Sequence, residues 1–351
     1  MKFVALFLFF ILITGVIGSN YENMNKSEPK ADSIFDKKST ISTIFYDKND
    51  AAHFKDYENE SHILQWYEWW YANLKGEDGK GIVAIFFTLG DLNNPLLSTA
   101  GVFIAFLDEK ESIEKVTCYP FIDYSLDYEK CNVSIAGNRF YEENGAFIIE
   151  YEEKGFSVFM KLYPEGKAFG NATKIKDWQW AAWYVAMPYG KGEVRVKYKG
   201  REYYIKGNAY HDHNWGISKK MDFKWDWGEF NVNNEFAIIY GFAGNGERKG
   251  GIHFVNGSDH IFIPYGEAKI EYIEWKRICG FKEPTKMHLY GKKENISIDF
   301  YVELHEAYIL GYKSIGKPYL LGKAYGSIKI NGKEMQFSSI GFYEHHEIMP
   351  W

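Results

Sequence analysis

Two polar blocks set among aromatic residues carry the groups in this sequence that could do acid–base chemistry. One block, residues 68–71, reads Glu-Trp-Trp-Tyr, and the other, residues 210–216, reads Tyr-His-Asp-His-Asn-Trp-Gly. Imidazole and carboxyl groups beside indole rings can exchange protons with an apolar substrate near neutral pH, because burial moves their pKa values toward that range. Both blocks are therefore candidates for an active site or a binding site.

Strand alternation divides the second block into two sets, because residues two apart on a strand share a face. One face carries two imidazoles and an indole: His211, His213 and Trp215. The other face carries a phenol, a carboxylate and an amide: Tyr210, Asp212 and Asn214. We interpret the first set as lining a ligand pocket, and the second set, together with Glu68, as a structural polar network. A register shifted by one residue would exchange the two roles.

Further aromatic residues could complete the wall of an apolar pocket. We expect four of them there: Trp70, Trp225, Trp227 and Phe242. An ordinary core stripe is the alternative for Trp225 and Trp227. Near the end of the chain, Glu344 stands beside His345 and His346, and we interpret this group as a solvated loop.

Other catalytic classes find little support. His-x-His can bind a metal, but no carboxylate follows His213 until Asp222, so we expect neither a metal nor a cofactor. The sequence has no G-x-S-x-G, H-E-x-x-H, G-x-G-x-x-G or P-loop motif, which argues against serine hydrolases, zinc proteases and nucleotide-dependent enzymes. The net charge of −6 excludes a basic nucleic-acid binder, and the 19% aromatic content excludes wholesale disorder.

The elements that must position these blocks are strands. Short apolar or alternating runs recur between turn residues, for example at 81–89, 101–107, 146–151 and 296–304, and Asn331-Gly332 predicts a tight hairpin turn. About fifteen strands are too many for one small barrel. The sequence therefore predicts an all-β protein with two antiparallel β-barrel domains, at 46–218 and 219–351.

The N-terminus reads as an export signal. A lone Lys2 precedes an apolar run that ends at Gly18, and we assign residues 1–20 to a signal peptide or membrane anchor. Residues 21–45 are polar and form a tether. We therefore expect an exported protein that contacts the membrane only through this segment. Cys118 and Cys131 could form a disulfide there or stay buried thiols, and the sequence leaves both open.

Four motifs together resemble the carotenoid 1,2-hydratase (hydroxyneurosporene synthase) and AttH-like family. They are Glu68-Trp69-Trp70-Tyr71, the block 210–216, Trp225-x-Trp227-Gly228 and Gly341-Phe342-x-Glu344, in that order across most of the chain. The resemblance implies two packed lipocalin-like barrels. It also implies a cofactor-free enzyme that adds water to an isoprenoid double bond, or cyclises a polyene.

The resemblance assigns catalytic roles to three residues. His213 and Trp215 match the residues expected at the reacting double bond, and Tyr240 matches an expected aromatic on a later strand. Phe242 stands where hydratases carry an acid, and Asp212 or Glu68 could replace that acid only by facing the cavity. We expect action on a hydrophobic small molecule, isoprenoid or lipid-like, as hydratase, isomerase or cyclase. The alternative is a lipid carrier without turnover.

Overall fold

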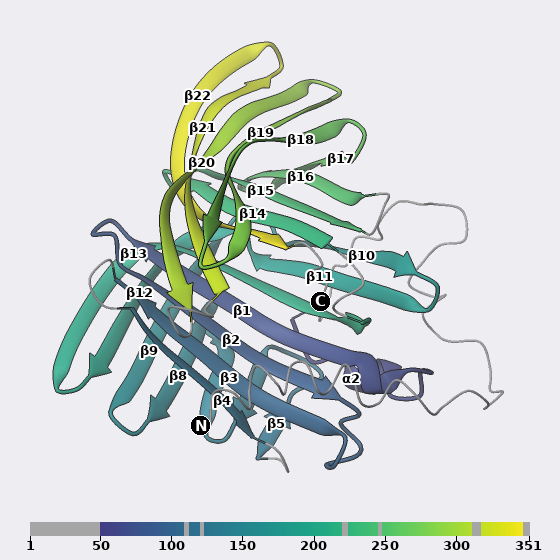
Figure 1. The fold of residues 1–351 in the computed structure, drawn as a ribbon, viewed down its shortest axis with the longest axis vertical. Coiled ribbons are helices and arrows are strands. Elements are labelled where there is room, and N and C mark those ends of the chain that lie inside the picture. Colours follow the sequence, from purple (N-terminus) through teal and green to yellow (C-terminus); the bar gives the residue numbers. More distant parts are fainter. Residues whose placement is uncertain are drawn as a thin grey trace.

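A computed structural model describes residues 50–108, 112–119, 123–219, 224–244, 248–310 and 317–346 (Figure 1). The expected signal segment 1–20 and tether 21–45 lie outside the described residues. Within the described part, helix is confined to one turn of α-helix, α2 (Phe54–Tyr57), and one 3-10 turn, η2 (Ile63–Gln65). No helix of that part is long and apolar enough to cross a membrane.

The first sheet is antiparallel and has 13 strands. They are β1 (Trp66–Gly76), β2 (Gly81–Gly90), β3 (Ser98–Leu107), β4 (Ile113–Tyr119), β5 (Tyr124–Leu126), β6 (Asn132–Ile135), β7 (Asn138–Glu143), β8 (Ala146–Glu153), β9 (Phe156–Glu165), β10 (Phe169–Lys176), β11 (Gln179–Met187), β12 (Tyr189–Tyr198) and β13 (Arg201–Ile217). The spatial order is β4-β3-β2-β1-β13-β12-β9-β8-β7-β6-β5, and the β10–β11 hairpin joins it through β13.

The second sheet is antiparallel and has nine strands. They are β14 (Lys224–Val232), β15 (Phe236–Gly244), β16 (Lys249–Asn256), β17 (Asp259–Pro264), β18 (Ala268–Ile278), β19 (Phe281–Lys293), β20 (Ile296–Leu310), β21 (Lys317–Ile330) and β22 (Lys333–His346). The spatial order is β17-β16-β15-β14-β22-β21-β20-β19-β18. The chain passes from one sheet to the other between Ile217 and Lys224, near the predicted domain boundary.

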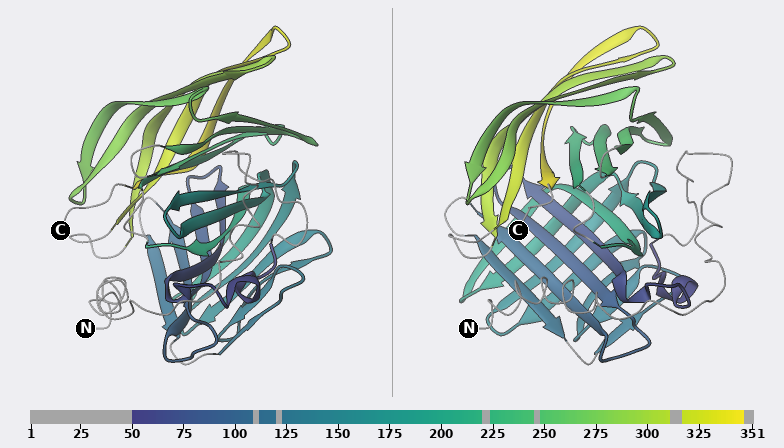
Figure 2. Two further views of the ribbon diagram at one scale, coloured as in Figure 1. Left: turned by 90° about the vertical axis from the view of Figure 1, so that its right-hand side faces the viewer. Right: turned by 45° about the vertical axis from the view of Figure 1, so that its right-hand side comes forward.

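The two sheets curl separately and pack against each other, as the two views of Figure 2 show. Each encloses its own apolar core. A further cluster, with members such as Tyr71 and Tyr210 from the first sheet and Ile239 and Phe342 from the second, fills the space between their outer faces. The predicted all-β fold with two lipocalin-like, barrel-like domains is therefore confirmed.

Local sequence explains these strands. In β9, residues 156–162 alternate buried and half-buried, which is the period of a sheet with one face toward a core. At the tip of the β21–β22 hairpin, Asn331 and Gly332 both have positive φ, at 51° and 82°. That pair is typical of a type I′ turn, so the predicted turn chemistry is confirmed there.

Strand β13 positions the polar block 210–216 because it is paired along both edges. One edge pairs with β1 from Trp66 to Gly76, and the other pairs first with β12 and then with β11. A strand held on both edges has its register fixed, so each side chain of the block is committed to one face of the sheet.

Candidate functional site

The two motif blocks predicted to carry chemistry are direct neighbours in the first sheet. In the pairing of β1 with β13, Trp70 lies opposite His213 and Tyr71 lies opposite Asp212. Directly paired residues point to the same face, so each face combines side chains from both blocks. The inner face joins the core of the first barrel, and the outer face is turned toward the second sheet.

A cavity of about 200 Å³ lies between the two sheets, against this outer face. Its walls combine aromatic rings from both sheets: Tyr67, Trp69, Tyr71, Trp183, Trp225, Trp227 and Phe242. Three carboxylates also line it, namely Asp212, Asp226 and Glu344. Mostly apolar walls with a few placed polar groups are the usual composition of a small-molecule site.

Asp212 is the best-positioned acid of the cavity. Its Oδ2 accepts hydrogen bonds from Tyr210 Oη at 2.7 Å and Trp183 Nε1 at 2.9 Å, and its Oδ1 accepts one from Asn214 Nδ2 at 2.9 Å. Burial raises the pKa of Asp212 to about 7, although the bonds from Tyr210 and Trp183 oppose the rise. The nearby Glu344 carboxylate raises it further. Near neutral pH, a large fraction of Asp212 therefore carries a proton that it can donate.

The other two carboxylates have different surroundings. Asp226 is buried and fully engaged, because it accepts hydrogen bonds from Arg248 at 2.6 Å, Tyr272 at 2.7 Å and His345 Nδ1 at 2.7 Å. Asp212 accepts as many hydrogen bonds, but only Asp226 is paired with an arginine, so Asp226 serves to hold strands of the second sheet together. Glu344 is half-buried and accepts one bond of 3.2 Å from Trp225 Nε1.

Glu344 corrects one sequence interpretation. We expected a solvated loop at 344–346, but these residues belong to strand β22, and Glu344 pairs with Trp227 of β14. The sequence signal for a strand was weak there because polar residues dominate the end of the chain. The pairing with β14, more than 100 residues away in sequence, decides the conformation.

The inner face holds a second polar cluster, enclosed in the first barrel. His213 Nε2 lies 3.2 Å from Glu68 Oε1, and the His213 ring stacks on Trp70 at a centroid distance of 4.4 Å. Glu68 Oε1 also accepts a bond of 2.6 Å from the His53 backbone N–H. Burial raises the pKa of Glu68 to about 8, although His53 opposes the rise. His211 and Trp215 lie on this face too, and both are buried.

The predicted site residues therefore divide among three places. Trp225 and Trp227 line the cavity between the sheets, as do Asp212 and Asn214 from the expected polar network. Phe242 borders the cavity as well, but its ring packs beside Tyr240 in the core of the second sheet. The barrel interior of the first sheet receives Trp70, His211, His213, Trp215 and Glu68. Tyr240 lies in the core of the second sheet, so the structure does not bring it to His213.

Strand alternation was correct, but it could not tell which face carries the cavity. Sequence reasoning missed Trp69 and Trp183 as cavity walls, and Trp183 as a donor to Asp212. The available signal was a pair of aromatic residues in the β10–β11 hairpin, Trp178 in its turn and Trp183 in the middle of β11. Only the docking of the second sheet shows that this hairpin borders a site.

A buried ion pair ties the two sheets together beside the cavity. Lys75 Nζ of β1 donates to Glu229 Oε1 of β14 at 2.5 Å, and Asn73 Nδ2 donates to the same oxygen at 3.2 Å. The backbone N–H of Phe342 adds a bond of 3.3 Å. Removing either Lys75 or Glu229 would leave the other charge buried and unpaired, so this ion pair favours one docking arrangement of the two sheets.

No protein-family model and no curated protein matches the sequence. Two of the solved structures that are similar to this chain show the fold that it shares. A candidate AttH protein from Nitrosomonas europaea aligns with a TM-score of 0.61 at 14% identity, over 83% of this chain and 95% of that one. Kievitone hydratase from Nectria haematococca aligns with a TM-score of 0.52 at 13% identity, over 83% and 92% of the respective chains. At these identities the likeness establishes that the chain has the double-barrel fold of AttH-like proteins.

Proposed function

We propose that this protein is an acid–base enzyme that protonates a carbon–carbon double bond of an apolar molecule bound between the two sheets. One observation carries the proposal: Asp212, an acid with a pKa of about 7, lines an aromatic cavity. A general acid works best when its pKa lies near the working pH. The hydrogen bonds from Tyr210 and Trp183 hold this acid in place.

The geometry supports a simple sequence of steps. Asp212 gives its proton to one alkene carbon, and the positive charge develops on the other carbon. Indole faces such as those of Trp183 and Trp227 stabilise a cation through their quadrupoles. The cation then gains water, loses a neighbouring proton or is attacked by a second double bond. Water addition releases a proton from the added water, and elimination releases one from a neighbouring carbon. Attack by a second double bond moves the charge to another carbon, which then loses a proton. In each route Glu344, the partly exposed carboxylate, accepts that proton, and exchange with solvent returns a proton to Asp212.

The cavity limits what can bind. Its volume of about 200 Å³ lies below the roughly 300–1,000 Å³ of sites that enclose a drug-sized ligand. A long isoprenoid or other lipid-like molecule would place only its reacting end between the sheets. One of the similar solved structures is named a hydratase. This name favours addition of water over loss of a proton or attack by a second double bond.

Deuterium transfer from solvent tests the proposal without knowledge of the product. The full-length protein is incubated in D2O with lipids that co-purify with it and with a panel of isoprenoids and polyenes. Protonation of carbon leaves carbon-bound deuterium, which mass spectrometry detects for hydration, isomerisation and cyclisation alike. We expect incorporation with wild type and none with Asp212→Asn. Asp78→Asn, at an exposed turn, is the matched control and should behave as wild type.

The alternative function is a lipid carrier, and the same experiment separates it. A carrier would co-purify with an apolar molecule, and Asp212→Asn would still bind it, but wild type would leave no deuterium on carbon. A result in which His213→Ala abolishes incorporation while Asp212→Asn retains it would place the acid in the barrel interior instead.

We also propose that the enzyme is exported, with its folded part outside the cytoplasm. Support comes from the apolar run that ends at Gly18 and the polar segment that follows it. Cell fractionation followed by N-terminal sequencing tests this. We expect either cleavage near residue 20 or a full chain in the membrane fraction. A full-length chain in the cytosol would contradict the proposal.

A further inference from the structure

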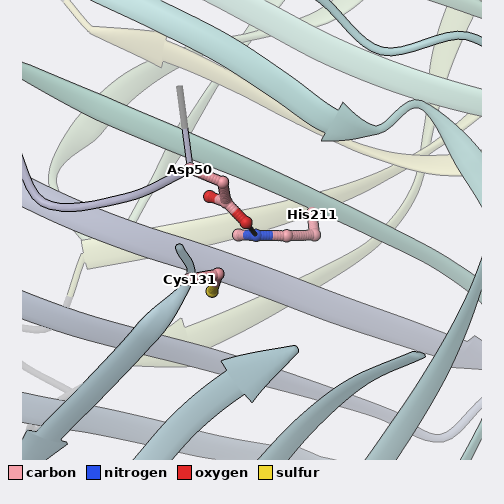
Figure 3. A group of neighbouring side chains, drawn as sticks. All are labelled: Asp50, Cys131 and His211. Atoms are coloured by element: carbon pink, nitrogen blue, oxygen red, sulfur yellow. Dashed lines mark hydrogen bonds and ion pairs between the residues drawn. The ribbon is translucent and has the colours of Figure 1, made fainter. Parts of the chain in front are cut away.

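A cluster of metal-ligating side chains lies in the first barrel, away from the cavity between the sheets. Asp50, Cys131 and His211 each offer one donor atom, and these atoms all lie within 4.8 Å of one another. Figure 3 shows the three side chains and the hydrogen bond that joins Asp50 to His211. The three residues come from distant parts of the chain. Asp50 precedes α2, Cys131 precedes β6, and His211 lies on β13.

The hydrogen bonding of His211 leaves one of its ring nitrogens facing a carboxylate oxygen of Asp50. His211 Nδ1 lies 2.7 Å from the backbone oxygen of Tyr71, and a carbonyl oxygen can only accept, so Nδ1 carries the hydrogen. In the neutral ring, Nε2 then carries a lone pair. That lone pair faces Asp50 Oδ2 at 2.9 Å. Either a hydrogen, as in an ordinary histidine–aspartate pair, or a metal ion must therefore lie between Nε2 and Oδ2.

The same bond is the support that metal-ligating histidines usually have. Such a histidine donates its other ring N–H to a carbonyl or carboxylate, which fixes the ring and leaves the free nitrogen for the metal. The second oxygen of Asp50 adds a further indication. Oδ1 is buried and makes no hydrogen bond to a described residue, and His213 Nδ1 lies 3.7 Å away on that side.

We propose that Asp50, Cys131 and His211 bind a divalent transition-metal ion, with Zn²⁺ the best match. One sulfur, one nitrogen and one oxygen donor suit Zn²⁺, and a hard cation such as Mg²⁺ or Ca²⁺ would not select a thiol. Donors around tetrahedral Zn²⁺ lie roughly 3.4 Å apart, given metal–ligand distances of about 2.0–2.3 Å. The three donor atoms therefore have to move by on the order of 1 Å to bind one ion together.

The ion would act as a structural tie. Cys131 and His211 are almost fully buried, whereas the Asp50 side chain is 14% exposed and gives the ion a way in. Binding would fasten the chain before α2 to the barrel interior, next to His53 and its contacts with Glu68. The sequence interpretation of no metal considered only carboxylates that follow His213. Asp50 stands 161 residues before His211, where only the fold could reveal it.

Cobalt substitution tests the site, because a thiolate bound to Co²⁺ gives a near-ultraviolet charge-transfer band. The full-length protein is stripped of metal with a chelator and titrated with Zn²⁺ or Co²⁺. We expect one equivalent to bind, the charge-transfer band to appear with Co²⁺, and Zn²⁺ to raise the melting temperature. Cys131→Ser keeps the shape of the side chain and should lose the band and bind at least about tenfold more weakly.

Cys279→Ser is the matched control, because Cys279 lies at the end of β18 in the second sheet, and it should keep both the band and the affinity. Circular dichroism of the metal-free variants shows that each is folded before it is compared. Three results would overturn the proposal: no thiolate band with wild type, a band that survives Cys131→Ser, or a band lost in Cys279→Ser. In the first case the charge between His211 and Asp50 is a proton.

Discussion

Replacing Asp212 with Asn should change how stability depends on pH, and this change measures the property on which the proposed chemistry rests. Asn has nearly the same shape and can still accept the bonds from Tyr210 and Trp183, but it cannot ionise. In the folded protein the Asp212 pKa is about 7, against 3.8 for an ordinary aspartate. Between these values the folded chain keeps a proton that the unfolded chain has released.

The sign and the size follow from proton linkage. Stability rises with pH where the unfolded state binds more protons, so here it falls as pH rises from about 4 to about 7. Integrated from pH 5 to pH 8 with those two pKa values, Asp212 costs wild type about 3 kcal/mol of unfolding free energy. The asparagine side chain cannot ionise, so the variant does not lose this stability. The unfolding free energy of the variant minus that of wild type should therefore increase by about that amount between pH 5 and pH 8.

Urea unfolding of both proteins at pH 5 and pH 8 gives the four free energies required. Glu68, whose pKa is also raised, contributes equally to both proteins and cancels in the difference. If the variant and wild type lose stability in parallel between the two pH values, Asp212 is already ionised in the folded state. The assignment of Asp212 as the general acid would then be refuted.

Three further predictions follow from the geometry. Trp183→Phe removes a bond to ionised Asp212, so its pKa and the pH above which deuterium incorporation fails should both rise; an unchanged pH profile would contradict this. Lys75→Met should cost about 3–5 kcal/mol in urea unfolding because Glu229 is left unpaired in the interface, and adding Glu229→Leu should restore much of that loss. Gly332→Ala should cost about 1 kcal/mol through its φ of 82° alone, since no neighbour lies within 4 Å, whereas an unchanged melting temperature would argue against the type I′ turn.

The sequence by itself determined the fold class and the two faces of each motif strand. Alternation in strands such as β9 and the Asn331-Gly332 turn are local signals, because a side chain's direction on a strand depends only on its parity. The motif blocks 68–71 and 210–216 could likewise be recognised as belonging together. The condition that Asp212 or Glu68 could serve as the acid only by facing the cavity followed from the family resemblance, because Phe242 stands where hydratases carry an acid.

Only the tertiary structure decided which face is functional. Both faces of β13 are apolar enough to be buried, one in the barrel core and one under the second sheet, so their composition could not rank them. The same holds for His211 and Asp50, which are 161 residues apart, and for Lys75 and Glu229. Such contacts arise from the docking of separately curled sheets and from the path of the chain into the barrel. No local sequence pattern predicts them, because the two partners of each contact lie far apart in the sequence.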